Sequence, residues 1–308
     1  MTPEAWIQTR TGARSAQLDG TVQSLWQGYG RIERWRLEGC VHPTVILKVV
    51  RPPSGQGIGH ERKLRSYTVE AAFYERHAPL LSGHARVAAL LGHRLHRNER
   101  WLLLEDLDPA GFPHRSRGLD AAGLGTCLDW LAGFHARFLG EPADGLWERG
   151  TYWHLGTRPE EWDRMPAGPL KEAAAGLDAA LAAARTLTLV HGDAKPANFC
   201  FGLRPGDPVA GVDFQYVGRG IGLVDVAYLV GCMGGRWCMR HAGEALQHYF
   251  QRLRQHAPAA ALHAEADWRP LWPVAWADFA RFMAGWGHQD WRRDPYTALM
   301  VREAIASL

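Results

Sequence analysis

The sequence has no long run of apolar residues. The longest stretch without a charged side chain, Gly20–Gly30, has only 11 residues and contains glycines and polar groups. A helix that spans a membrane needs about 20 consecutive apolar residues, so the sequence predicts no such helix and no membrane partner. The first residues, MTPEAWIQTR, lack the apolar segment of a secretory signal. We therefore expect a cytoplasmic protein.

Cysteine and net charge are also low. The five cysteines are odd in number and form no Cys-x-x-Cys pair, which argues against a disulfide framework or a zinc ribbon. The 15 histidines include no His-Glu-x-x-His motif. The 35 basic and 32 acidic side chains leave a net charge of only +3, which argues against a dedicated nucleic-acid-binding protein. We expect reduced thiols and no nucleic-acid partner.

The hydrophobic pattern changes near residue 105. Before it, short β-branched and aromatic runs predict strands over 21–26, 31–37, 45–50, 87–95 and 101–104. The composition of residues 51–60 predicts a loop, and a helix is expected over 64–77. After residue 105, helical spacing predominates, as over 123–138 and 171–185, with two short strands over 199–203 and 209–214. A β-rich part followed by a helical part predicts an α+β fold of two lobes, residues 1–104 and 105–308.

The segment HGDAKPANF, residues 191–199, carries the strongest chemical signal. Asp193 is followed by Asn198 at the start of a predicted strand, and Asp213 ends the paired strand 15 residues later. A hairpin of this length brings Asp213 back beside Asn198. Kinases use such an arrangement: one carboxylate accepts the proton of an attacking hydroxyl, while a second carboxylate and an amide oxygen hold Mg²⁺.

The first half of the chain offers a lysine that suits the same chemistry. Lys48 lies inside the apolar strand VILKVV, and an unpaired buried charge is costly, so this lysine must be paired or face a polar cleft. Glu70 follows 22 residues later on the predicted helix and is the expected partner. Glu61 and Glu75 are rival partners, better explained as residues of a solvated face. Lys48 could also reach solvent from an edge strand.

Other positions allow two interpretations. Gly28 and Gly30 lie in the first predicted hairpin, where backbone amides could approach phosphates, although a simple turn explains them too. Lys195 either touches the γ-phosphate or faces solvent. The basic stretch His60–Arg65 is better explained as the solvated start of a helix than as a polyanion site.

These segments together resemble the aminoglycoside phosphotransferase and choline kinase-like branch of the protein kinase-like fold, and are most similar to the ecdysteroid kinase-like group. The matching segments are SLWQGYG, ILKVV, RKLRSYTVEAAFY, LLLEDL, LAGFHARF, HGDAKPANF and VDFQYVGRGIGLVDVAYL. The resemblance implies a bilobal fold with a small antiparallel-β N-lobe, containing one helix, and a larger, mostly helical C-lobe. It also implies an ATP- and Mg²⁺-dependent kinase that acts on a hydroxyl of an amino alcohol, aminoglycoside, sugar or steroid. The enzyme would be a monomer or a weak homodimer.

The resemblance gives roles to the residues already singled out. It implies that Asp193 is the catalytic base and that Asn198 and Asp213 bind Mg²⁺. His191 would brace the catalytic loop, and Asp225 would anchor it. The remaining residues would serve the nucleotide: the phosphate-positioning pair Lys48 and Glu70, then Gly28, Gly30 and Lys195, and the hinge backbone from Glu105 to Leu107.

Two alternative functions are a protein kinase and a pseudokinase that binds nucleotide without catalysis. Only 12 residues separate Asp213 from Asp225, which leaves no room for a long activation segment, and no Ala-Pro-Glu follows. Pseudokinases usually lack one of the key groups, whereas this chain has all of them.

The 14 tryptophans are numerous, and several gather late in the chain. Helical spacing places five apolar residues on one face: Trp272, Trp276, Phe279, Met283 and Trp286. This face is either part of the core or the aromatic wall of an acceptor pocket, with Asp278 or Asp290 nearby. Such a wall would suit a cationic or a flat apolar acceptor.

Overall fold

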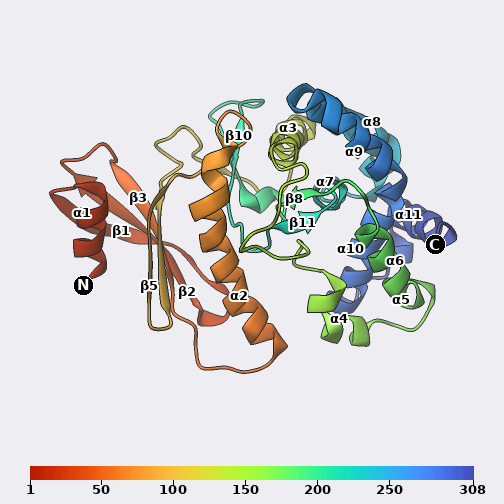
Figure 1. Ribbon diagram of the computed structural model, residues 1–308, viewed down its shortest axis with the longest axis horizontal. Coiled ribbons are helices and arrows are strands. Elements are labelled where there is room, and N and C mark those ends of the chain that lie inside the picture. The colour runs from red at the N-terminus through yellow and green to blue at the C-terminus, as the bar shows by residue number, and fades with distance from the viewer.

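The computed structural model describes all 308 residues as an antiparallel sheet at one end and a group of helices at the other (Figure 1). The N-terminus lies at the sheet end and the C-terminus among the helices, while α2 (Ile58–Ala72) runs between the two parts. None of the helices combines the length and the apolar character needed to cross a bilayer.

The large sheet has five strands, all paired antiparallel, in the order β1-β2-β3-β6-β5. Their bounds are β1 (Ser15–Ser24), β2 (Gly30–Glu38), β3 (Thr44–Val50), β5 (Leu90–His96) and β6 (Glu99–Glu105). One face of the sheet is covered by α1 (Pro3–Thr11), a helix that the hydrophobic pattern did not predict. Thr2 caps α1, and the ring of Trp6 packs edge-on against Trp101.

Strand β3 shows how the sheet orients the site. Side chains alternate between faces, so Val45, Leu47 and Val49 join the cluster under α1. Ile46 and Lys48 therefore point to the opposite face, toward α2 and the helical part, where both line a cavity. The lysine of the apolar strand thus faces the interior of the molecule, so it does not reach solvent from an edge.

Helix α2 begins six residues before its predicted start. The glycine- and proline-rich loop ends at Gly57, whose φ of 96° is open to glycine at little cost, and the helix starts at Ile58. The loop composition therefore concealed the first turns of the helix. At its other end, α2 continues into a π-helical turn over Phe73–His77.

The second half of the chain is mostly helical and contains most of a core of 64 buried residues. Its helices are α3 (Ala121–Arg137), α4 (Pro159–Arg164), α5 (Pro169–Glu172), α6 (Ala174–Ala182), α7 (Leu223–Gly231), α8 (Gly235–His256), α9 (Pro258–Trp268), α10 (Trp272–Trp286) and α11 (Pro295–Ala306). The helix expected over 171–185 is divided into α5 and α6, because helical geometry is interrupted at Ala173.

Short strands lie on either side of the segment from His191 to Asn198. One small sheet has the order β4-β10-β9-β7, and a second pairs β11 with β8. Their bounds are β4 (Arg86–Val87), β7 (His114–Arg115), β8 (Thr188–Val190), β9 (Phe199–Phe201), β10 (Val209–Gly211) and β11 (Gly218–Gly220). Strands of two or three residues are too short for a clear periodic signal, although the β9–β10 hairpin was predicted. The strand expected over 87–95 is divided between β4 and β5.

Candidate active site

The loop after β8 is held in place by Asp225, a fully buried carboxylate in the first turn of α7. Its two oxygens accept the backbone N–H groups of His191, at 2.6 Å, and of Gly192, at 2.9 Å. His135 on α3 lies 3.1 Å from the same carboxylate. Gly192 has a φ of 78°, and a Cβ there would lie 2.2 Å from the carbonyl oxygen of Tyr216, so the tight turn requires glycine.

Asp193 follows this turn and is 6% exposed. Its Oδ2 accepts hydrogen bonds from Lys195 Nζ at 2.8 Å and from Asn198 Nδ2 at 2.9 Å. Its Oδ1 is buried and has no hydrogen-bond partner. Burial raises the pKa of this carboxyl, against the opposing charge of Lys195. A buried acceptor without a partner is costly, so Oδ1 is poised to receive a donor from outside the chain.

Asn198 and Asp213 both line a cavity next to Asp193. Because Asn198 uses its Nδ2 to bond Asp193, its side-chain oxygen is left as an acceptor. Asp213 has a φ of 67°, and its side chain is 37% exposed. Burial works against ionisation of Asp213, but the charges of Lys48, Lys63 and Lys195 outweigh it and lower the pKa of this carboxyl.

These oxygens suit a hard cation. No group of three or more His, Cys, Asp and Glu side chains in the structure forms a metal site. A cation beside Asn198 and Asp213 would therefore take its remaining ligands from water and from a bound phosphate. Mg²⁺ binds in this way, because it keeps several waters and needs only one or two protein carboxylates. The oxygen donors present thus fit Mg²⁺.

Lys48 pairs with Glu70, as its position on β3 suggested. Lys48 Nζ lies 2.7 Å and 2.8 Å from the two carboxylate oxygens of Glu70, and 3.6 Å from Asp213 Oδ1. Burial opposes the charge of Lys48, but Glu70 and Asp213 outweigh it and raise the pKa of the lysine. The rivals lie elsewhere: Glu61 is exposed, and Glu75 bonds His93.

The cavity between the large sheet, α2 and the β9–β10 hairpin has a volume of about 780 Å³. Its apolar lining residues include Leu25, Ile32, Ile46, Leu104 and Val212. Its polar lining residues include Lys48, Glu70, Lys195, Asn198 and Asp213. The predicted hinge from Glu105 to Leu107 also lines this cavity.

Gly28 and Gly30 are not brought into the cavity. Gly30 has a φ of 140°, and a Cβ there would lie 1.9 Å from the carbonyl oxygen of Val49, so glycine lets β2 start close against β3. Gly28 has a φ of 75° in the turn, and a Cβ at this position would contact no neighbouring atom. Both glycines therefore have a backbone reason to be present that does not involve phosphate.

Lys63 and Gln215 were missed as site residues. Lys63 Nζ donates to Gln215 Oε1 at 2.7 Å, and Gln215 Nε2 donates to Asp213. Burial lowers the pKa of Lys63 to about 8, although Asp213 counteracts this shift. In the basic stretch His60–Arg65, Glu61, Leu64 and Arg65 are exposed as expected, but Lys63 is turned inward toward Gln215. Lys63 lies two helical turns before Glu70, and this spacing, which places both on one face of the helix, was the signal in the sequence that pointed to Lys63.

Helix α10 divides the predicted aromatic face. Trp272 is buried, and Trp276, also buried, lines a second cavity of about 320 Å³ together with Phe279 and Met283, while Trp286 is half exposed. Tyr228, Cys232 and Asp290 line the same cavity. Asp278 does not, because it is buried against Arg281 and the indole N–H of Trp153.

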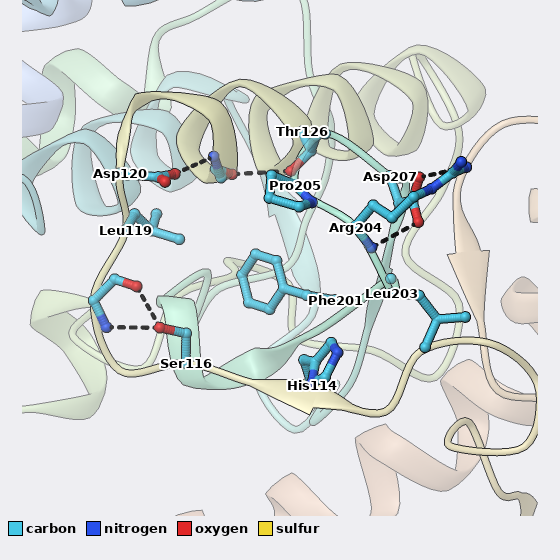
Figure 2. Close-up of a pocket in the computed structure, with 14 residues that line it drawn as sticks. His114, Ser116, Leu119, Asp120, Thr126, Phe201, Leu203, Arg204, Pro205 and Asp207 are labelled. Carbon is cyan, nitrogen blue, oxygen red and sulfur yellow. Dashed lines mark hydrogen bonds and ion pairs between the residues drawn. The ribbon is translucent and has the colours of Figure 1, made fainter.

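A third cavity, also of about 320 Å³, lies between β7, the β9–β10 hairpin and the start of α3 (Figure 2). The polar groups around it satisfy one another. Asp120 accepts from the backbone of Gly123, and Arg204 pairs with Asp207. It contains none of the predicted site residues, and no lining side chain has a buried polar atom without a partner.

Comparisons with known proteins identify a matching family and similar folds. The model of the family described as "Phosphotransferase enzyme family" matches residues 30–271. No curated protein sequence matches the chain. A candidate fructosamine-3-kinase from Thermobifida fusca is 15% identical over 99% of both chains, with a TM-score of 0.55. Ethanolamine kinase from Plasmodium vivax is 12% identical over 93% of this chain and 82% of its own, with a TM-score of 0.53. These two likenesses confirm the α+β, protein kinase-like fold.

An aminoglycoside phosphotransferase from Streptomyces rimosus is also similar. It is 16% identical over 80% of this chain and 91% of its own, with a TM-score of 0.48.

Proposed function

We propose that this protein transfers the γ-phosphoryl group of ATP, with Mg²⁺, to a hydroxyl group. The proposal starts from the family match: the chain belongs to the phosphotransferase enzyme family and is a small-molecule kinase. The observation that carries this proposal is the buried carboxylate of Asp193: its Oδ1 has no partner, and its Oδ2 is bonded by Lys195 and Asn198, which both line the large cavity. An acceptor-only group in that position is suited to orient a hydroxyl and take its proton.

The cavity offers a matching place for the nucleotide. Ile46 and its cross-strand neighbour Leu104 line the cavity next to the hinge backbone, and these apolar side chains suit a flat base. The ammonium of Lys48, fixed by Glu70, lines the same cavity and can meet the phosphates. The lining therefore offers apolar contacts to an aromatic base and a cation to the charged groups of the same ligand.

Asn198 and Asp213 would hold the Mg²⁺ that accompanies the nucleotide. When bound, the cation neutralises charge on the transferred phosphoryl group. Asn198 also orients Asp193 through its Nδ2, so the same side chain would serve the cation and the base. Lys195 donates to Asp193 Oδ2, which leaves Oδ1 as the free oxygen of that carboxylate.

Three tyrosines that do not line the nucleotide cavity lie close enough to Asp193 to be affected by its charge. Burial raises the pKa of Tyr152, Tyr216 and Tyr228, and the negative charge of Asp193 adds to each increase, so all three hydroxyls lie within its field. The hydroxyls of Tyr152 and Tyr228 are 3.4 Å apart. Tyr228 also lines the cavity against α10. We place the acceptor there.

The charges near this aromatic cavity favour a flat, largely apolar alcohol over a polycation. Asp290 is paired with Arg292 and Arg293, so its charge is already compensated. Asp294 caps α11 by accepting from Thr297. An aminoglycoside, with several ammonium groups, would find only the Asp294 carboxylate without a cationic partner at these positions, whereas aromatic rings can stack on a planar or steroid-like acceptor.

The test combines a screen with two variants. ADP release is measured with steroids, other flat alcohols, amino alcohols, sugars and aminoglycosides, and we expect the largest signal from the first two classes. Asp193→Asn should lower turnover by about 10²–10⁴-fold while nucleotide affinity is kept. Near-normal turnover would refute the assignment of the base. Nucleotide binding without transfer to any acceptor would favour a pseudokinase instead.

The second variant, Asp213→Ala, addresses the cation. We expect it to weaken ADP binding when Mg²⁺ is present and to change it little when Mg²⁺ is absent. Titration calorimetry at several Mg²⁺ concentrations measures this difference. Equal affinities of wild type and variant at every concentration would rule out Asp213 as a ligand. Asp163→Asn is the matched control for Asp193→Asn, and Asp163→Ala for Asp213→Ala, because Asp163 is exposed and its side chain lies outside the site.

A further inference from the structure

Helix α2 presents three polar residues toward the site from one face. Lys63, Ser66 and Glu70 are spaced by three and four residues, which places them along one side of a helix. Glu70 reaches Lys48 on β3. The other two reach Gln215, in the loop that follows Asp213. One helix thus contacts two separate parts of the site.

Gln215 connects α2 to Asp213 through both ends of its amide. Lys63 Nζ donates to Gln215 Oε1 at 2.7 Å, and Ser66 Oγ lies 3.1 Å from the same oxygen. Gln215 Nε2 donates to Asp213 Oδ1. The glutamine is only 4% exposed, and its backbone carbonyl accepts from the indole N–H of Trp147 at 2.8 Å.

The chemistry of Lys63 determines which way this amide points. A lysine ammonium has donors only, so it requires the oxygen of Gln215 on its side, and the NH₂ group must then face Asp213. If the amide turned over, its oxygen would meet the Asp213 carboxylate and repel it. The present orientation occupies Asp213 Oδ1, which also lies 3.6 Å from Lys48 Nζ. Oδ2 is the oxygen left for a ligand.

We propose that Lys63 is a positioning residue that fixes the amide of Gln215, so that Gln215 holds Asp213 with one oxygen directed to the Mg²⁺–nucleotide. This inference rests on the proposed function, because it assigns a role around the cation of that function. It also explains why Lys63 is turned inward while Glu61, Leu64 and Arg65 on the same helix are exposed.

Lys63→Met tests the role, because methionine removes the donor but keeps an unbranched side chain. That side chain can still cover the Tyr67 ring, whose centroid lies 4.9 Å from Lys63 Nζ. We measure ADP affinity by calorimetry at a series of Mg²⁺ concentrations. Losing a partner that orients a metal ligand typically costs 10–100-fold in metal affinity, so the Mg²⁺ concentration for half-maximal effect should rise by about tenfold. ADP affinity without Mg²⁺ should stay the same, which a merely structural role would not produce.

Three further variants make the result decisive. Lys63→Arg keeps a donor and should restore the wild-type Mg²⁺ dependence, and it remains informative if Lys63→Met folds poorly. Gln215→Leu should reproduce the defect, and adding Lys63→Met to it should have no further effect, because both act through one contact. Lys171→Met is the matched control, because Lys171 lies on α5 and bonds only carbonyl groups of Asp163 and Met165.

The outcomes separate this inference from the proposed function. A wild-type Mg²⁺ dependence in Lys63→Met, or additive effects of Lys63→Met and Gln215→Leu, would overturn the role of Lys63 while leaving the kinase assignment intact. If ADP affinity of the wild-type protein were independent of Mg²⁺, the cation site and the role of Lys63 would both fail. If the Lys63→Met and Gln215→Leu variants behaved as expected but no acceptor were phosphorylated, only the proposed transfer would fail.

Discussion

Asp225→Asn tests the anchor of the catalytic loop without any knowledge of the substrate. Every group that faces this carboxylate can donate: the backbone N–H groups of His191 and Gly192, and the ring nitrogen of His135. The other ring nitrogen of His135 lies 2.8 Å from the hydroxyl of Tyr249. Asparagine has the shape of aspartate, but its NH₂ group must point at one of these donors.

The structure gives the size of the effect. The substitution removes at least one charge-assisted hydrogen bond, worth about 1.5–3 kcal/mol, and leaves a buried N–H without an acceptor, which costs about 1–3 kcal/mol. No cavity is created, because the two side chains have nearly the same volume. The free energy of unfolding should therefore fall by about 2.5–6 kcal/mol.

Urea denaturation followed by circular dichroism measures this difference. Asp163→Asn is again the control, because the same chemical change at an exposed position should alter the free energy of unfolding by less than about 0.5 kcal/mol. Equal stability of the two variants would refute the argument that Asp225 holds the loop. Nucleotide binding by Asp225→Asn should weaken as well, since Asn198 belongs to the same loop.

Other consequences of the site can be tested by substitution. Glu70→Gln leaves the ammonium of Lys48 buried with only Asp213 nearby, so we expect a loss of about 3 kcal/mol in unfolding free energy; an unchanged urea midpoint would contradict the pairing. Gly30→Ala should lower the melting temperature more than Gly28→Ala, because only the first places a Cβ against the carbonyl of Val49. If Gly28→Ala instead impaired ATP binding without loss of stability, the phosphate role of this glycine would be supported.

Much of the candidate site follows from short-range rules. Asp193 and Asn198 are five residues apart on one loop, and a single hairpin returns the chain to Asp213, so no distant contact is needed to predict their meeting. Lys48 was placed by its apolar strand, because alternation on β3 leaves only one polar side for it. Its pairing with Glu70 required only one further helix.

The parts that could not be predicted depend on contacts between distant segments. Helix α1 has few apolar residues, and only Trp6 and Ile7 are buried, so its place on the sheet depends on Trp101 and other distant partners. Lys63 faces inward because Gln215, 152 residues later, supplies an acceptor. The requirement for glycine at position 30 comes from the neighbouring strand, which no local pattern reveals.

The cluster beneath α1 has a practical consequence for studies of this enzyme. Its 11 buried residues include Trp6, Trp35 and Trp101, and they form an apolar core separate from the larger one. The sheet and the helices are therefore expected to melt in separate steps, which calorimetry would resolve as two transitions. A ligand that fills the space between the two parts would make them melt together. A change from two melting transitions to one would therefore report binding in a screen that needs no enzymatic turnover.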